Sequence, residues 1–205
     1  MEKFKQTVHI IKKKILKAIL HFVAIIYARP KKVGEKNIPK EGNYIICANH
    51  VHALDAPVLV LSLKREVIFI AKEELFKNKL LKWLGKAFDV IAIKRDSADM
   101  EAMKLSFKAL KQGKILGLFP EGTRNGMAKG VKPHNGAALI ALKTNSPIIP
   151  VGIQGNFKPF RKVKLNIGKP MDFSKYAKEK NDKEVLDKIT KQVMDEVVRL
   201  TNEKI

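Results

Sequence analysis

The feature that most constrains the fold is a repeated alternation of short apolar runs with longer helix-like segments. Runs of four to eight apolar residues that end at turn residues are typical of buried strands. We predict strands at 44–48, 66–71, 90–93, 115–118 and 147–153. Helical spacing of apolar residues predicts helices at 57–63, 73–87, 97–111, 135–143 and from about 182 onward. Strands and helices in this order predict one α/β domain with a largely parallel sheet flanked by helices.

Two further segments have weaker patterns. Val163, Leu165 and Ile167 alternate with polar residues, which predicts a half-exposed strand near a sheet edge. Residues 31–42 contain several breakers and are predicted to form a loop. We therefore divide the chain into residues 1–40, a basic amphipathic helix with its loop, and residues 41–205, the predicted enzyme domain.

The charge of the chain is strongly positive. The 205 residues contain 41 Lys and Arg against 20 Asp and Glu, a net charge of +21. Such a chain is expected to meet a polyanion, which can be a nucleic acid, an anionic membrane surface or an acidic carrier. One cysteine, Cys47, excludes an intrachain disulfide framework and is expected in the core. No pattern of a cleaved signal peptide is present.

The first helix combines this charge with an apolar stripe. Apolar residues from Val8 to Ile26 recur at spacings of three and four, and lysines fall between them. Its least polar run, 18–28, would extend about 16 Å, roughly half of a hydrocarbon core. We predict a helix that lies in the plane of a membrane surface. A core helix with a solvated lysine face is the alternative.

Asn49-His50-Val51-His52-Ala53-Leu54-Asp55 follows directly after the first predicted strand of the domain. Loops at the carboxyl ends of parallel strands collect functional groups. A carboxylate bonded to His50 would orient its imidazole as a general base, so we predict His50 and Asp55 as the catalytic pair. Asn49 is placed in the substrate site, where its amide can also hold the turn.

Two other interpretations of this motif stay open. His50 and Asp55 can simply cap the following helix. His50, His52 and Asp55 also approach a zinc-hydrolase pattern, but the spacing differs by one residue and no second paired histidine motif exists. We therefore predict no metal and no resident cofactor.

A second motif supplies an anion site. Glu121-Gly122-Thr123-Arg124 comes just after another strand and should lie on the same sheet edge. The turn's N–H groups, the Thr123 hydroxyl and the Arg124 guanidinium can hold a phosphate monoester. Two more cations at strand ends, Lys72 and Arg95, are candidates for the same site.

These blocks together resemble the glycerolipid acyltransferase family. The resemblance is carried by Asn49-His50 with Asp55, by the strand that ends in Arg95, by Phe119-Pro120-Glu121-Gly122-Thr123-Arg124, and by Ile149-Pro150-Val151. They occur in the family's order over about 45–155. Departures are His52, Asp89 and Asn125, which stand where Ser, Gly and Ser are frequent.

The resemblance implies transfer of a fatty acyl group from acyl carrier protein or coenzyme A to the sn-2 hydroxyl of 1-acylglycerol-3-phosphate, giving phosphatidic acid. His50 would deprotonate the hydroxyl, without an acyl-enzyme. Glu121, Gly122, Thr123, Arg124 and Arg95 would bind the acceptor. We predict that the protein lies at the cytoplasmic face of an anionic membrane, as a peripheral or monotopic protein.

Three alternatives are kept. The acceptor can be another lysophospholipid or glycerol-3-phosphate. A metal-dependent hydrolase would contain stoichiometric zinc. A nucleic-acid-binding module would use the +21 charge, but one Trp, three Tyr and no recognisable motif speak against it, so nucleic acid is not expected as a partner.

Overall fold

The computed structural model describes residues 29–63, 65–79, 82, 85, 90–93, 100–155, 157–158 and 160–203, together with Ile15 and Ile19. The strands of this part of the chain are β1 (Lys31–Val33), β2 (Tyr44–Ala48), β3 (Val67–Lys72), β4 (Ile91–Ile93), β5 (Ile115–Leu118), β6 (Ile148–Gly155) and β7 (Val163–Ile167). Its longer helices are α2 (Asp55–Ser62), α4 (Met100–Lys111), α5 (Gly136–Thr144) and α6 (Lys183–Asn202). Its short 3-10 helices are η1 (Glu35–Asn37), η2 (Glu73–Lys77), η3 (Met127–Lys129) and η4 (Ser174–Glu179).

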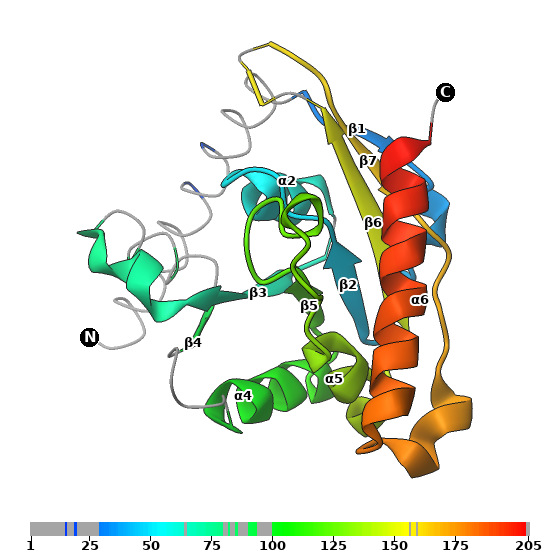
Figure 1. Ribbon diagram of the computed structural model, residues 1–205. Helices are drawn as coiled ribbons and strands as arrows, with labels where there is room; N and C mark the ends of the chain where they lie inside the picture. Colours follow the sequence, from blue (N-terminus) through cyan, green and yellow to red (C-terminus); the bar gives the residue numbers. More distant parts are fainter. Residues whose placement is uncertain are drawn as a thin grey trace.

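The seven described strands form one sheet in the order β1-β7-β6-β2-β5-β3-β4 (Figure 1). From β6 to β4 every neighbouring pair is parallel, whereas β7 is antiparallel to β6 and parallel to β1. The predicted α/β fold with a largely parallel sheet is therefore confirmed. Because β2, β5 and β3 run the same way, the loops after their last residues meet at one edge.

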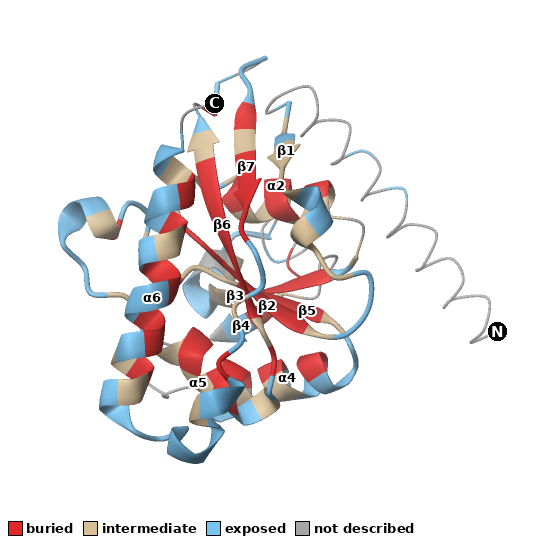
Figure 2. Cartoon of the chain, turned by 90° about the vertical axis from the view of Figure 1, so that its right-hand side faces the viewer, coloured by how far each residue is buried: buried red, intermediate tan, exposed pale blue. Residues whose placement is uncertain are grey.

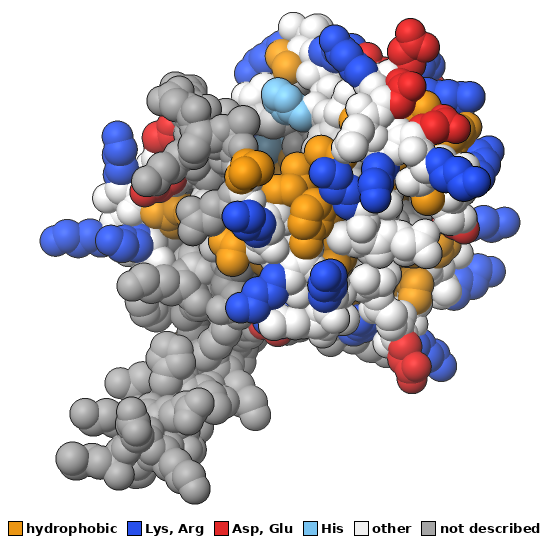
Figure 3. All heavy atoms as spheres, turned by 90° about the horizontal axis from the view of Figure 1, so that it is seen from below, with side chains coloured by type: hydrophobic (Ala, Val, Ile, Leu, Met, Phe, Trp, Pro, Cys, Tyr) orange, Lys and Arg blue, Asp and Glu red, His pale blue; other side chains and the backbone are white. Residues whose placement is uncertain are grey.

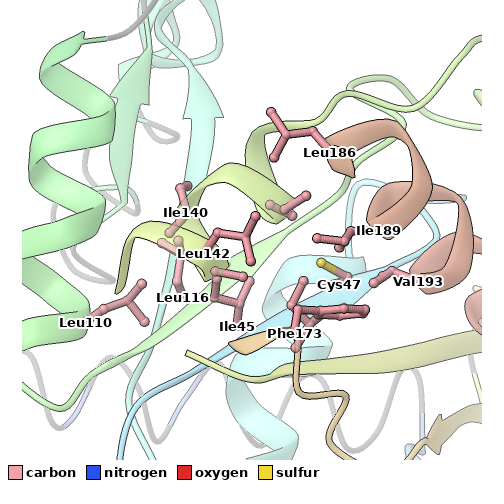
Figure 4. Packing of buried hydrophobic residues seen from close by; sticks show 14 of the residues in the cluster. Ile45, Cys47, Leu110, Leu116, Ile140, Leu142, Phe173, Leu186, Ile189 and Val193 are labelled. Carbon is pink, nitrogen blue, oxygen red and sulfur yellow. The ribbon is translucent and has the colours of Figure 1, made fainter. Parts of the chain in front are cut away.

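Helices cover both faces of the sheet, and β2 shows why. Its alternate residues Ile45 and Cys47 pack among side chains of α4, α5 and α6 (Figure 4). Tyr44 and Ile46 point to the other face, where α2 packs. Figure 2 shows α6 and α2 on opposite sides, with buried residues on the helix face toward the sheet and exposed residues outside. Period-two alternation in a strand with two covered faces produces this uniformly apolar run.

Two expectations about the sheet edge were wrong. Residues 31–42 are not only loop, because Lys31–Val33 form β1 and pair with β7. β7 lies second from the edge of the sheet, near the edge as predicted, but it is not half-exposed, because it is buried except for the half-buried Lys164. Asn166 is 1% exposed, and its side-chain amide donates to the carbonyl of Leu200 in α6. Because Asn166 is polar, the sequence pattern predicted an exposed position, although its side chain is buried and hydrogen-bonded.

Helix boundaries differ more than strand boundaries. The predicted helix 73–87 begins as the 3-10 helix η2, and the helix expected from Ser97 is described from Met100 onward. Asp182 caps α6, because its carboxylate accepts the N–H groups of Glu184 and Val185. Strand bounds agreed better because their flanking turn residues are sharper signals than the ends of amphipathic helices.

Most of the predicted N-terminal helix lies outside the described residues. Ile15 and Ile19 are helical and each 55% exposed. Residues four apart share one helix face, so these two isoleucines present an apolar strip. Within the described part of the chain, no helix combines the length and hydropathy that crossing a membrane requires.

Candidate active site

The loop that follows β2, residues 49–55, is named the base loop. Its geometry is centred on Asp55, the first residue of α2, whose side chain is fully buried. Asp55 Oδ2 lies 2.7 Å from His50 Nδ1 and accepts the N–H groups of Val51 at 2.7 Å and His52 at 2.8 Å. The carboxylate therefore closes the loop and orients the imidazole at the same time.

This bond determines which nitrogen of His50 is reactive. An ionised carboxylate only accepts hydrogen bonds, so Nδ1 carries the proton and Nε2 has the lone pair. The His50 side chain is 21% exposed, whereas Asp55 has no exposure. The alternative of a simple helix cap is not supported, because the start of α2 has no side-chain cap hydrogen bond.

Aromatic rings fix the plane of His50. Its imidazole stacks on Phe119 with ring centroids 4.2 Å apart, and Phe119 stacks on Phe69 at 5.3 Å. Gly117 makes room for this stack, since a Cβ atom there would lie 2.5 Å from the Phe69 ring. This role of Phe119 was not predicted from the sequence, where the residue stood only among those that carry the family resemblance.

The buried side chain of Asn49 is bonded to β6. It is 2% exposed, its amide donates to the carbonyl of Ile153 at 3.0 Å, and its oxygen accepts the N–H of Ile153 at 2.7 Å. These two bonds attach the start of the base loop to β6. Asn49 therefore holds the turn, the second of the two roles considered for it, and its place in the substrate site stays a prediction.

The buried carboxylate of Glu121 bonds two backbone groups. It is 1% exposed; Oε1 accepts the N–H of His50 at 2.8 Å and Oε2 accepts the N–H of Met127 at 2.8 Å. Both carboxylate oxygens are thus used inside the protein. Glu121 therefore holds the backbone of His50 and Met127 in place, and its role toward the acceptor stays a prediction.

Residues 122–130 are named the clamp loop, and they lie directly against the base loop. The N–H of Asn125 donates to the carbonyl of His50 at 2.6 Å. Arg124 is exposed, Thr123 is half-buried, and Gly122 has a φ of 62°. The structure thus brings Gly122, Thr123 and Arg124 beside His50, as the strand-end argument predicted.

Other predicted residues are described only partly. Lys72 ends β3, next to β5 in the sheet, but its side chain is outside the described set. Arg95 and Asp89 lie outside the described residues altogether. Their parts in the anion site stay predictions.

His52 points away from a shared metal site with His50. Its ring stacks on Phe157 with centroids 4.5 Å apart, and its Nδ1 accepts the N–H of Leu54 at 3.2 Å. Among the described residues, no three His, Cys, Asp or Glu side chains gather as metal ligands would. Burial raises the pKa of the Cys47 thiol, so that residue is a core side chain rather than a nucleophile.

The fold and this site together define an α/β domain that holds a carboxylate-oriented histidine at the carboxyl ends of its parallel strands. The family described as Acyltransferase matches residues 29–154. The chain belongs to this acyltransferase family, and the predicted resemblance is confirmed.

Relatives of known name agree with the family. The chain is 31% identical over 157 residues to 1-acyl-sn-glycerol-3-phosphate acyltransferase of Bacillus subtilis, covering 72% of this chain and 76% of that protein. It is 32% identical over 120 residues to the protein of that name from Borreliella burgdorferi, covering 58% and 48%. The crystal structure of the 1-acyl-sn-glycerophosphate (LPA) acyltransferase PlsC from Thermotoga maritima superposes with a TM-score of 0.67 and 27% identity, over 94% of this chain and 83% of that one.

Proposed function

We propose that this protein transfers a fatty acyl group from an acyl thioester to the sn-2 hydroxyl of 1-acylglycerol-3-phosphate, producing phosphatidic acid for phospholipid synthesis. The observation that carries the proposal is the 2.7 Å contact between His50 Nδ1 and Asp55 Oδ2 beside the turn that contains Arg124. The names of the Bacillus and Thermotoga relatives support the same acceptor.

In the proposed reaction, His50 Nε2 removes the hydroxyl proton of the acceptor. The oxygen attacks the thioester carbonyl, a new C–O bond forms, and the C–S bond breaks. The departing thiolate takes the proton back from His50. Asp55 stabilises the imidazolium in between, and Arg124 with the turn N–H groups binds the 3-phosphate.

Acyl carrier protein and coenzyme A are both proposed as donors, since each presents the same thioester. No step in this scheme uses a metal or a resident cofactor, so a chelator should leave the rate unchanged.

We place the protein at the cytoplasmic face of an anionic membrane as a peripheral protein, because its acceptor and product are lipids.

The test is thiol release by the purified full chain, with lysophosphatidic acid, other lysophospholipids or glycerol-3-phosphate as acceptor and either thioester as donor. We expect release only when an acceptor is present, with lysophosphatidic acid preferred. Preference for another acceptor would correct the substrate, and release without any acceptor would indicate a hydrolase.

The matched variants are His50→Ala and His52→Phe. Loss of the general base should lower kcat by about 10²–10⁴. His52→Phe keeps the stack on Phe157 and should retain most of the activity. Near-normal turnover by His50→Ala would overturn the mechanism.

A further inference from the structure

The edge of the sheet at which His50 lies is named the catalytic edge. The hairpin between β6 and β7 extends past it. The pairing of β2 with β6 ends at Ala48 and Val151, yet β6 continues to Gly155. At about 3.3 Å per residue, these four additional residues extend about 13 Å beyond the end of β2. Figure 1 shows the yellow hairpin projecting at the top of the molecule, beyond the arrowhead of β2.

An aromatic side chain lies exposed at the end of this hairpin. Phe160 is 69% exposed and has a φ of 62°. The N–H of Arg161 donates to the carbonyl of Lys158 at 3.1 Å, so the turn is closed around it. Bulky residues rarely adopt positive φ, and a large ring in water is unfavourable. The fold therefore presents Phe160 outward at a conformational cost.

The residues around Phe160 are cationic. Lys158, Arg161 and Lys162 are exposed, and the sequence from 156 to 171 contains no Asp or Glu. An apolar ring surrounded by basic side chains suits the boundary of an anionic bilayer, where the ring lies among acyl chains and the cations lie among phosphates. We propose that the hairpin tip (Lys158, Phe160, Arg161 and Lys162) inserts into the surface of an anionic lipid bilayer.

The base of the hairpin is attached to the base loop. Phe157 is 8% exposed and stacks on His52 at 4.5 Å, two residues after the predicted catalytic histidine. Asn49 binds β6 at Ile153 by two hydrogen bonds. A bilayer that holds the tip therefore lies on the same side of the protein as His50.

The rival surface is the outer face of α4, where Met100 is 73% exposed beside Lys104, Lys108 and Lys111. Figure 3 shows Lys and Arg side chains spread over the lower face with hydrophobic ones between them. Positive charge alone thus does not mark a membrane face. However, α4 ends at Lys111, just before β5 begins at Ile115, so its C-terminus lies at the edge opposite His50. The hairpin is favoured because it lies at the catalytic edge.

A spin label can measure insertion directly. Cys47 has no exposure and its pKa is raised by burial, so a cysteine introduced at the surface is the one that labels. Phe160→Cys and Met100→Cys, both in the full chain, are labelled and mixed with vesicles of phosphatidylglycerol and phosphatidylcholine. We expect the label at 160 to lose access to a water-soluble nickel chelate and gain access to oxygen, while the label at 100 stays in water.

This readout does not require enzymatic activity, so it can fail independently of the proposed function. It also reports the position of the tip whichever other segment binds the vesicle. A label at 160 that stays in water on vesicle-bound protein would overturn the proposal, as would a protein that does not bind vesicles. Immersion of the label at 100 instead would assign the membrane face to α4.

Charge is tested by two matched triple variants. Lys158→Gln, Arg161→Gln and Lys162→Gln should weaken vesicle binding by up to about 100-fold, from about a fivefold loss per basic residue near the surface. Lys104→Gln, Lys108→Gln and Lys111→Gln remove the same charge from α4 and should weaken it far less. Equal losses in the two triples would show a general charge effect and contradict insertion of the hairpin tip.

Discussion

The base loop and the clamp loop meet at one edge of the sheet, but they are built differently. In the base loop, Asn49 and Asp55 are buried; the Asn49 amide bonds the backbone of Ile153 in β6, and the Asp55 carboxylate accepts the N–H groups of Val51 and His52. In the clamp loop, Arg124 and Lys129 are exposed, and the Lys129 ammonium donates to the carbonyl of Arg124 at 3.0 Å. The base loop is held in place by its own hydrogen bonds before a substrate binds, whereas the clamp loop presents these side chains to solvent.

This difference corresponds to the two proposed tasks. Proton transfer needs a base within hydrogen-bond reach and in one tautomer, so its orientation must be set before the acceptor arrives. A phosphate carries its own charge and several acceptor oxygens, so an exposed cation can complete its contacts during binding. Substitutions in the base loop should therefore act on kcat, and those in the clamp loop on the KM of the acceptor.

The largest effect is expected from Asp55→Asn. Asparagine keeps the shape and one acceptor oxygen for the three N–H groups that now meet Oδ2, but it removes the charge that would stabilise the His50 imidazolium. We expect kcat to fall by about 10²–10⁴ with little change in KM. Steady-state kinetics checks this, with thermal unfolding as the control for folding. A kcat within tenfold of the parent would contradict the conclusion that substitutions in the base loop act on kcat.

Arg124→Ala should have the next largest effect. Loss of a charge-assisted contact with a phosphate should raise the acceptor KM by about 10–100-fold. Because Arg124 is exposed, kcat and the unfolding temperature should change little. Arg124→Lys serves as the conservative variant and should recover part of the affinity. An unchanged KM in Arg124→Ala would remove Arg124 from the anion site.

Glu121→Gln sharpens the comparison, because Glu121 precedes the clamp loop while its carboxylate serves His50. The glutamine amide would place an N–H₂ against one of the two backbone N–H donors, His50 or Met127. We expect unfolding to become easier by about 1–3 kcal/mol and kcat to fall about tenfold, with KM unchanged. A higher KM at normal stability would instead assign Glu121 to the acceptor, as the family resemblance implied.

The smallest effect is expected from glycine substitutions in the clamp loop. Gly122 and Gly130 have φ values of 62° and 70°, so alanine at either position should cost about 1 kcal/mol of stability. A Cβ atom at Gly122 would lie 2.7 Å from His134 Nε2, whereas nothing lies within 4 Å at Gly130. His134 is exposed and can rotate away, so both variants should unfold alike. Only Gly122→Ala should raise the acceptor KM, by a few-fold; the same rise in Gly130→Ala would contradict a local phosphate site.

The strands next to the site were the best-predicted elements. The predicted bounds 44–48 and 115–118 match β2 and β5 residue for residue. Both strands are buried on two faces, so their sequences are continuous apolar runs between clear turn residues. His50 and Asp55 were also paired correctly, since they are only five positions apart and the turn between them is a local feature of the chain.

Contacts between distant segments were not predictable in the same way. The His50–Glu121 bond joins residues 71 apart, and the Asn49–Ile153 bonds join residues 104 apart. The pairing of β1 with β7 is another such contact, and the sequence pattern did not show it, because residues 31–42 were predicted to form a loop. Periodicity reports which face of an element is buried, but not which residue from elsewhere buries it.

The sequence by itself determined the alternating strands and helices, the order of the motifs and the His50–Asp55 pair, because each depends on spacing along a few neighbouring residues. The tertiary structure decided that Asn49 and Glu121 hold the base, that Phe119 fixes its ring, and that Phe160 projects beyond the catalytic edge. Those roles depend on which side chains the packed sheet brings together, and that is set by the fold as a whole.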